Sequence, residues 1–329
     1  MLKKLLATLS IAAASTVMFA VPVAAQEVPK EINFGIISTE SSQNLKKDWE
    51  VLLEDMQNRL GVKVNAFFAP DYAGIIEGMR FNKVQVAWFG NKSGMEAVDR
   101  SSGEVFAQQI AEDGSPGYWS YLIVPASSAL NSIEDVKKNA KSLSLGYGDP
   151  NSTSGFLVPG YYAMAQHGLD PKTSFKLMRS ANHETNLMAV ANKQVDIATN
   201  NNESFEKFAR RNPDKAKEIK VIWKSPLIPS DPMVWRKDLH PELKAKIKDF
   251  FVSYGKDERE KAALKKIGIG GFQASDDNQL LPIRQLEMFK VKLATERDDK
   301  MSASEKQAKL NEIDKKLSAL NQQLVALKK

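Results

Sequence analysis

The chain has 329 residues, of which 43% are hydrophobic and 26% charged, so it can bury one large or two moderate cores and is not disordered by composition. It contains no cysteine, which excludes a disulfide framework, a thiolate metal site, a cysteine nucleophile and a lipid anchor on an N-terminal cysteine. The formal net charge of +6 is a mild excess beside 40 acidic residues, which argues against a nucleic-acid partner but suits a small anionic ligand.

The first 25 residues have the pattern of a secretory signal peptide. Lys3 and Lys4 precede an apolar run at 5–23, and small residues at its end predict cleavage after Ala25. A retained membrane anchor is the alternative, but hydroxyl residues interrupt the run. No later stretch reaches the roughly 20 apolar residues that span a bilayer. We therefore expect export to the periplasm, with residues 1–25 removed.

The next part of the chain alternates between strand and helix patterns. A β-branched apolar run at 32–37 predicts a buried strand, and the apolar spacing of 45–60 predicts a helix that Gly61 ends. Two further strands, with a helix between them, are predicted at 62–68 and 84–89. This order is typical of a parallel, doubly wound sheet.

A second α/β unit is predicted between two crossings of the chain. An apolar strand at 118–125 leaves the first unit, and the run 221–227 returns to it. Between the crossings we expect two strands and two helices, the strands at 142–147 and 195–199 and the helices beginning at Ser152 and covering 186–192.

Two crossings between lobes form a hinge. The predicted first lobe therefore has two pieces, 26–120 and 225–295, and the second lobe is the continuous segment 121–224. Residues 296–329 form a separate helical tail.

The tail carries leucine and isoleucine with alternating spacings of three and four residues, the a/d pattern of a short coiled coil, at Leu310, Ile313, Leu317, Leu320, Leu324 and Leu327. The repeat is shorter than the three to four heptads that identify a coiled coil. We expect a homodimer through these side chains; the alternative is an amphipathic helix that packs on its own chain.

Three consecutive hydroxyl residues, Ser152, Thr153 and Ser154, lie between a predicted strand and a predicted helix. Free N–H groups and the helix dipole both favour an oxyanion at such a turn, so the sequence predicts an anion cradle. Simple N-capping by one of the hydroxyls is the alternative.

Three other polar clusters contain His183, Glu203 and Asp231. The first is not a His-Glu-x-x-His motif, so it does not predict a zinc protease. Glu203 follows a predicted strand, where its carboxylate could meet a ligand amine, although an ordinary polar loop also explains it. Asp231 precedes a proline in the crossover 225–232, which is also a common turn signal.

Several segments together resemble the phosphonate-binding periplasmic proteins of ABC importers. They are the segments 69–74, 113–119, 148–155, 183–186 and 223–229, within a similarity that runs from about Ile32 to Ile283. The resemblance implies a two-lobed α/β periplasmic binding protein, type II-like, with a mixed sheet flanked by helices in each lobe and a C-terminal helical tail.

The same resemblance implies how the ligand is held. Phosphonate oxygens are expected on Tyr72, Tyr118, Ser152, Thr153, Ser154, the backbone of Gly155 and His183. Glu203 and Asp231 are expected at the ammonium of an aminoalkyl phosphonate such as 2-aminoethylphosphonate. Phe89 departs from relatives that carry tyrosine, so no hydroxyl contact is expected there. The resemblance implies a membrane permease as partner, and neither a cofactor nor a metal.

The main rival to a binding protein is a periplasmic hydrolase that combines a serine of 152–154 with His183 and either Glu203 or Asp231. The segment lacks Gly-x-Ser-x-Gly, which argues against a nucleophile elbow and against catalysis. A receptor for phosphite or phosphate is the other alternative.

Overall fold

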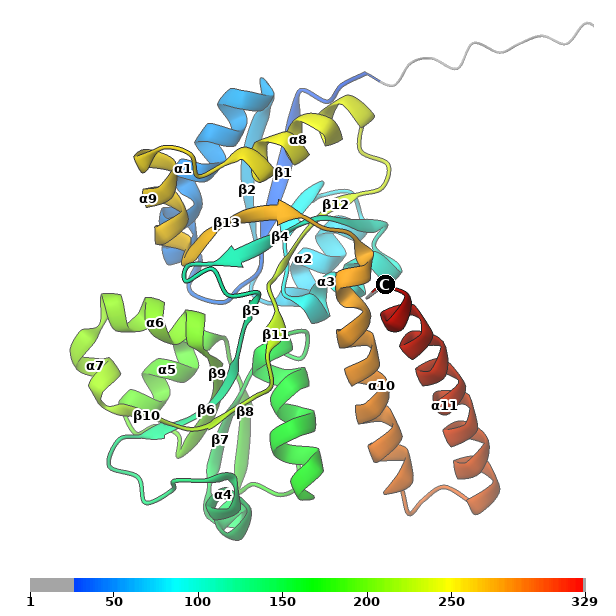
Figure 1. Cartoon of the computed structure of the whole chain (residues 1–329). Helices are drawn as coiled ribbons and strands as arrows, with labels where there is room; N and C mark the ends of the chain where they lie inside the picture. Colours follow the sequence, from blue (N-terminus) through cyan, green and yellow to red (C-terminus); the bar gives the residue numbers. More distant parts are fainter. Residues whose placement is uncertain (1–26, 328–329) are drawn as a thin grey trace, which may run out of the picture.

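Figure 1 shows two lobes, one above the other, with a pair of long helices along one side. This computed structural model describes residues 27–327. The predicted signal peptide lies outside the described residues. Among the described helices, none is both long enough and apolar enough to cross a membrane.

The upper lobe in Figure 1 contains a mixed six-stranded sheet in the order β13-β4-β12-β3-β1-β2. Its strands are β1 (Glu31–Ile36), β2 (Lys63–Phe68), β3 (Val86–Trp88), β4 (Gly103–Ala111), β12 (Pro232–Arg236) and β13 (Ile269–Ala274). β1 is parallel to β2 and β3, whereas β12 runs antiparallel to both β3 and β4. The parallel part is the predicted doubly wound segment.

Five helices flank this sheet, α1 (Ser42–Leu60), α2 (Tyr72–Arg80), α3 (Asn91–Arg100), α8 (Pro241–Ser253) and α9 (Glu258–Ile267). The predicted helix ending at Gly61 is confirmed: Ser41 caps its start, and Gly61 ends it with a φ of 67°, which glycine adopts without steric cost. Its apolar face buries Trp49 against Phe34 of β1, with ring centroids 5.4 Å apart.

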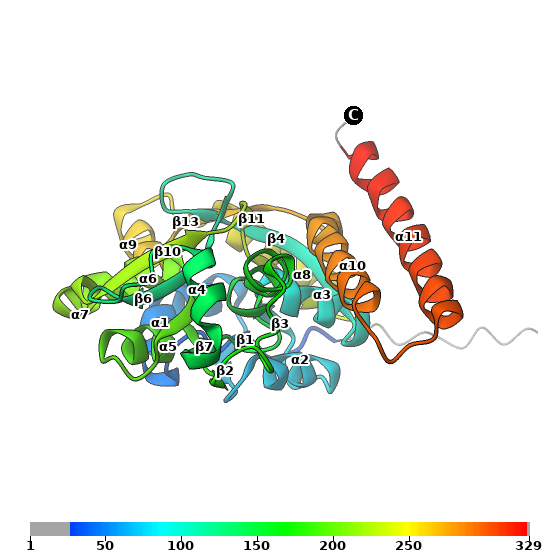
Figure 2. The same ribbon diagram turned by 90° about the horizontal axis from the view of Figure 1, so that it is seen from below.

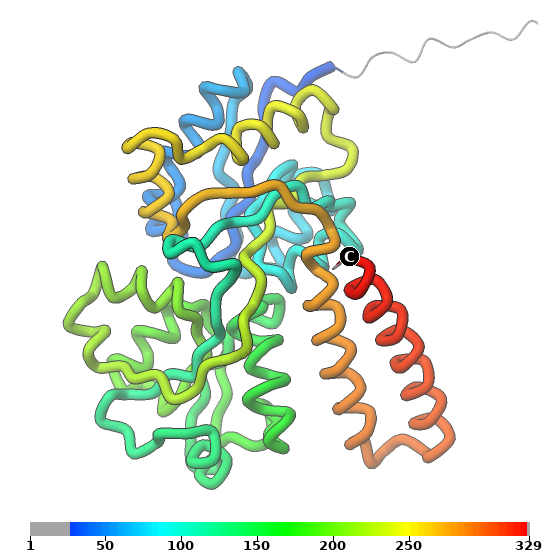
Figure 3. The backbone as a smooth tube through the Cα atoms, in the orientation of Figure 1, coloured from blue at the N-terminus to red at the C-terminus, as the bar shows by residue number. Residues whose placement is uncertain are grey.

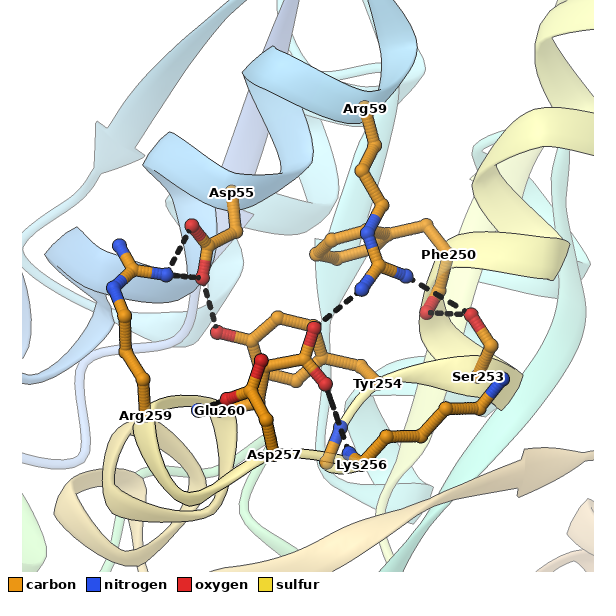
Figure 4. Close-up of polar contacts among 10 residues, drawn as sticks. Asp55, Arg59, Phe250, Ser253, Tyr254, Lys256, Asp257, Arg259 and Glu260 are labelled. Atoms are coloured by element: carbon orange, nitrogen blue, oxygen red, sulfur yellow. Dashed lines mark hydrogen bonds and ion pairs between the residues drawn. The ribbon is translucent and has the colours of Figure 1, made fainter.

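A polar network ties α1 to α8 and α9 on the surface of this lobe (Figure 4). Asp55 accepts hydrogen bonds from the Tyr254 hydroxyl at 2.7 Å and from Arg259 at 2.5 Å. Arg59 pairs with Glu260, whose other oxygen accepts two backbone N–H groups at 2.8 Å each. These contacts fix α9 relative to α1.

The lower lobe contains a five-stranded sheet in the order β10-β6-β9-β7-β8. Its strands are β6 (Ser120–Pro125), β7 (Ser144–Tyr147), β8 (Leu177–Ser180), β9 (Ile197–Asn201) and β10 (Ile219–Lys224). Its helices are α4 (Ile133–Asn139), α5 (His183–Ala191), α6 (Asn202–Arg211) and α7 (Pro213–Lys217).

One predicted helix of this lobe differs in form. The segment after Ser152 is not a regular α-helix but contains two π-helical turns, Thr153–Leu157 and Gly160–Met164. Pro159 lies between them and has no N–H to donate, which interrupts the regular α-helical ladder. π-Helical turns of this kind are frequent at functional sites.

The two lobes are joined by a short antiparallel ladder between β5 (Gly117–Tyr118) and β11 (Ile228–Pro229). The tube in Figure 3 shows the chain passing down through the first of these strands and back up through the second. The two segments lie next to the space between the lobes, so they place Tyr118 and Asp231 there.

The C-terminal tail is a helical hairpin of α10 (Leu281–Glu296) and α11 (Ala303–Ala326), which stands to one side of both lobes in Figure 2. Arg284 pairs with Asp99 of the first lobe, and Arg297 donates to the carbonyl oxygen of Ala165 in the second at 2.5 Å. α10 therefore bridges the lobes outside the crossover strands.

Some of the heptad side chains at the C-terminus pack against the rest of this chain, and the others do not. Ile313 and Leu317 are buried, whereas Leu327 is 53% exposed. The other three, Leu310, Leu320 and Leu324, are half-buried.

Candidate functional site

A small cavity of about 40 Å³ lies between the lobes beside the crossover strands. Eight of the nine site residues expected from the sequence line it, namely Tyr72, Tyr118, Ser152, Thr153, Ser154, His183, Glu203 and Asp231. The ninth, Gly155, lies directly behind the hydroxyl cluster and is not part of the lining. Residues from both lobes meet here although they lie up to 159 positions apart in the sequence, from Tyr72 to Asp231.

A close approach of two glycines shapes the anion side of the cavity. A Cβ on Gly148 would lie 2.5 Å from the Cα of Gly155, so the turn after β7 can pack here only as glycine. The N–H of Gly148 donates to the carbonyl oxygen of Gly155 at 3.0 Å, and the Thr199 hydroxyl donates to the same oxygen at 2.7 Å. These bonds fix the start of the π-helical segment, where the hydroxyl residues stand.

All three hydroxyl residues of this segment are buried, with 3% or less of their surface exposed. The Ser152 hydroxyl accepts the N–H of Gly155 at 3.0 Å, so this serine is also an N-cap. The Thr153 hydroxyl accepts the backbone N–H of Lys92 from the other lobe at 2.8 Å, and that of Ser154 accepts Asn201 Nδ2 at 3.0 Å. Each hydroxyl oxygen therefore already accepts one hydrogen bond, and its own proton remains available for donation to a ligand.

His183 opens α5 and points its imidazole at the same place. Its Nε2 lies 3.3 Å from Asn201 Nδ2 and 3.5 Å from the Ser152 hydroxyl. Burial lowers the pKa of His183 to about 4, so the ring is neutral at neutral pH. Nδ1 is buried and has no hydrogen-bond partner within the described residues. The imidazole can therefore offer a neutral N–H to a ligand oxygen.

Two carboxylates, Glu203 and Asp231, also line the cavity. Asp231 accepts the Tyr118 hydroxyl at 3.0 Å and Asn91 Nδ2 at 3.4 Å. Within residues 27–327, Glu203 has neither a hydrogen bond nor an ion pair through its carboxylate. Burial raises the pKa of both groups, and the charge of Asp231 raises that of Glu203 further. A cation between them would relieve both penalties.

The two tyrosines are held as neutral donors. Burial raises the pKa of Tyr72 and of Tyr118, and the nearby charges of Asp149 and Asp231 raise them further. The Tyr118 hydroxyl donates to Asp231, so it positions that carboxylate instead of facing an anion freely. Tyr72 reaches the hydroxyl cluster, and its backbone N–H donates to Asp149 at 3.2 Å.

Sequence reasoning missed several residues that line the cavity. Trp88, at the end of β3, has an indole N–H that is buried without a partner among the described residues, so it is a further donor for a ligand. Asn201 orients both Ser154 and His183. A tryptophan inside an apolar strand and an asparagine in an asparagine run give no sequence signal of this role.

An ion cluster, buried except for Arg211, spans the two lobes near the cavity, and we call it the interlobe ion cluster. Its members are Glu40 and Asp48 of the first lobe and Lys207 and Arg211 of the second. Lys207 Nζ lies 3.0 Å from Asp48 Oδ2. Nearby, the Glu184 carboxylate accepts the backbone N–H of Ser41 at 2.8 Å across the same boundary. These contacts join the two lobes directly.

The chemistry of the site suits recognition better than hydrolysis. The Ser152 oxygen and His183 Nε2 are 3.5 Å apart, at the limit of a hydrogen bond, and no carboxylate contacts Nδ1 within the described residues. A serine hydrolase base needs that third group for orientation. Among the residues described, no group of three acidic or histidine side chains could hold a metal ion.

Comparison with known proteins identifies relatives of this fold and site. The family of ABC-transporter periplasmic substrate-binding proteins for phosphonate matches residues 34–280. A phosphonates-binding periplasmic protein of Escherichia coli is 57% identical over 300 residues, covering 91% of this chain and 88% of that protein.

Solved structures agree with this similarity. A binding-protein component of an ABC phosphonate transporter from Pseudomonas aeruginosa has 55% identity and a TM-score of 0.89, covering 91% of this chain and 99% of its own. A Prochlorococcus marinus protein solved with methylphosphonate has the same fold at 23% identity, with a TM-score of 0.71, covering 78% of this chain and 97% of its own.

Proposed function

The chain belongs to the phosphonate-binding family of periplasmic substrate-binding proteins of ABC transporters, and on this premise we propose that its ligand is an aminoalkyl phosphonate such as 2-aminoethylphosphonate. The phosphonate lies on the hydroxyls of Ser152, Thr153 and Ser154, with further donors from Tyr72 and His183. The ammonium lies between Glu203 and Asp231. In the transporter, the protein delivers this ligand to the membrane permease.

The observation that supports the proposal best is the pair of carboxylates in the cavity. Glu203 lines the cavity half-buried, and within residues 27–327 no cation or donor contacts its carboxylate. A carboxylate that has lost part of its water and has no partner is costly, so a ligand that brings a cation gains what an uncharged alkyl group cannot. The neutral hydroxyl and imidazole donors suit an oxyanion in a dry cleft.

Relatives of lower identity are named for other oxyanions. One from Mycolicibacterium smegmatis, 28% identical, is called a phosphate-import protein, and one from Prochlorococcus marinus, 27% identical, a probable phosphite-binding protein. Neither anion carries an ammonium, so neither would use Glu203. Selectivity between ligands with and without an amine therefore decides between these proposals.

The variant Glu203→Gln tests the assignment. We expect it to weaken 2-aminoethylphosphonate by roughly 2–5 kcal/mol, because a buried ion pair is lost. Methylphosphonate should lose far less, because it has no charge to pair. Calorimetric titration of both ligands into both proteins measures the difference.

Glu206→Gln is the matched control, since Glu206 is exposed and lies one turn further along α6. It removes the same charge from the same helix without touching the cavity lining. Equal losses for the two phosphonates in Glu203→Gln, or equal effects of the two variants, would contradict the ammonium role.

We also propose a homodimer through the exposed side of the C-terminal hairpin. Val325 of α11 and Leu327, just past its end, are 56% and 53% exposed, and the heptad positions 310, 320 and 324 are half-buried. Ile313 and Leu317 are buried within this chain, so they stabilise the hairpin. The remaining heptad positions are the ones proposed to contact a second copy.

A further inference from the structure

A second cavity crosses the lobe boundary outside the ligand site. It is a groove of about 480 Å³ between α1 and α9 of the first lobe and α6 of the second. Figure 1 shows these three helices grouped at the side of the molecule away from the C-terminal hairpin. The cations that line this basic groove are Lys47, Lys207, Arg210, Arg211, Lys265 and Lys266.

The charges of the basic groove do not cancel. Lys207 and Arg211 are matched by Glu40 and Asp48 of the interlobe ion cluster, and Arg210 lies 3.3 Å from Glu112. The other three cations, Lys47, Lys265 and Lys266, are exposed. Within residues 27–327 no carboxylate lies within ion-pair distance of any of these three. The groove therefore presents about three unmatched positive charges along a concave surface.

The basic groove has walls from both lobes. One wall is α1 with α9, which the contacts of Asp55 and Glu260 in Figure 4 hold together. The other wall is α6, which belongs to the second lobe. Lys207 lines both the ligand cavity and the groove, and Glu203 lies one helical turn before it. The state of the ligand site and the width of the groove are thus linked through α6.

We propose that the basic groove is the docking site for an acidic polypeptide segment of the importer's membrane subunit, and that it is complete only in the closed protein. Three unmatched cations, with the aliphatic stems of lysine and arginine between them, suit an extended chain with several carboxylates. A bilayer surface is flat and cannot enter a concave groove between two lobes. The proposal rests on the family assignment but not on which phosphonate is bound.

The test compares two triple variants with equal changes in charge. The first is Lys47→Glu with Lys265→Glu and Lys266→Glu. The second replaces Lys137, Lys138 and Lys141 by glutamate; these exposed residues lie at α4, at the far end of the second lobe. None of the six lines the ligand cavity, so both variants should bind 2-aminoethylphosphonate with equal affinity.

The first readout is the binding of a fluorescent oligoglutamate peptide, followed by anisotropy with and without saturating 2-aminoethylphosphonate. We expect the phosphonate to tighten peptide binding to the wild type, and high salt to weaken it. The groove variant should lose roughly tenfold or more in peptide affinity, and the α4 variant should keep the wild-type value. The second readout is phosphonate uptake by the protein's own cells carrying each variant, which should fall only for the groove variant.

Several results would overturn the proposal. Equal loss of peptide binding in both variants would indicate general charge attraction. Normal uptake with the groove variant would show that the importer docks elsewhere. Binding to phosphatidylglycerol vesicles in place of the peptide would identify a membrane surface. Peptide binding that ignores the phosphonate would remove the link to closure. Failure of the wild type to bind 2-aminoethylphosphonate would instead contradict the proposed ligand, and the uptake readout would then use methylphosphonate.

Discussion

At the scale of single residues, the ligand cavity separates neutral donors from charged acceptors. His183 stays neutral because burial lowers its pKa to about 4, and the two tyrosines stay protonated because burial raises theirs. In the proposed binding mode the phosphonate is therefore recognised by dipoles instead of cations, whose strong attraction for any anion would reduce selectivity. The two carboxylates would then be satisfied only by a ligand that carries its own cation.

Asp231 gives this arrangement a measurable pH dependence. Burial raises the pKa of Asp231 to about 7, above its ordinary value of 3.8. The native state therefore binds a proton more tightly than the unfolded state, and the stability this provides is complete below about pH 4 and lost as pH rises through 7. Asparagine cannot ionise. We expect Asp231→Asn to gain roughly 2 kcal/mol relative to the ligand-free wild type between pH 5 and pH 8.

Thermal or urea unfolding of the ligand-free proteins at the two pH values measures this change. Asp238→Asn is the control: its partner Arg236 lowers the pKa of Asp238, so this carboxylate stays ionised from pH 5 to pH 8 and the stability change caused by the variant should be the same at both pH values. A stability difference between wild type and Asp231→Asn that is the same at pH 5 and pH 8 would show that Asp231 is not protonated in the empty cleft.

Residue identities at the site could be predicted where they form a local pattern or a family motif. Three hydroxyls in a row at a turn were visible in the sequence, and the resemblance supplied His183, Glu203 and Asp231. Trp88 could not be predicted because an indole in an apolar strand normally indicates core. The ion pairs between Glu40 and Arg211, 171 positions apart, have no local signature at all.

At the scale of elements, ion pairs between α6 and the first lobe join the two lobes, and we expect them to favour closure. Arg211 of α6 pairs with Glu40 and Asp48, both of which are buried. Arg211→Met leaves these carboxylates short of a partner in the closed state, while in an open state water would solvate them. We expect 2-aminoethylphosphonate and methylphosphonate to bind about tenfold more weakly, both by the same factor.

The control is Arg259→Met, which removes an equal charge paired with Asp55 inside one lobe. It should lower stability without changing affinity for either ligand, as titration and thermal unfolding would show. A loss confined to the aminophosphonate would mean that Arg211 acts on the ammonium site instead of on closure.

The C-terminal hairpin yields a second prediction at this scale. Removal of residues 302–329 should convert a dimer to a monomer in light scattering. Because this deletion also uncovers α10, the milder pair Val325→Lys with Leu327→Lys is the sharper test, since both side chains are exposed. Unchanged mass for both variants would count against the dimer and leave α11 as a helix that packs only on its own chain.

Elements in which apolar residues recur at regular spacing were predicted well, and elements without such a spacing were not. α1 and β1 carry clear apolar patterns and were confirmed. β4 was missed because the two glutamines at 108 and 109 interrupt its apolar run, although Gln109 is buried. The π-helical turns after Ser152 were predicted as a plain helix, because their distortion depends on packing and on Pro159 more than on periodicity.

At the scale of the whole molecule, the lobes enclose two different charge environments across one boundary. Two carboxylates line the ligand cavity, and the basic groove beside it carries unmatched lysines. α6 contributes to both, through Glu203 and Lys207 on successive turns. Ligand capture and presentation to the importer can therefore depend on the same closing movement.

The most direct test of the central claim is calorimetric titration of the protein with 2-aminoethylphosphonate, methylphosphonate and inorganic phosphate. We expect the aminophosphonate to bind most tightly, by a factor of roughly ten or more if one buried ion pair is gained, and to be recovered unchanged. Methylphosphonate or phosphate binding as tightly, or no binding of the aminophosphonate, would contradict the role given to Glu203 and Asp231.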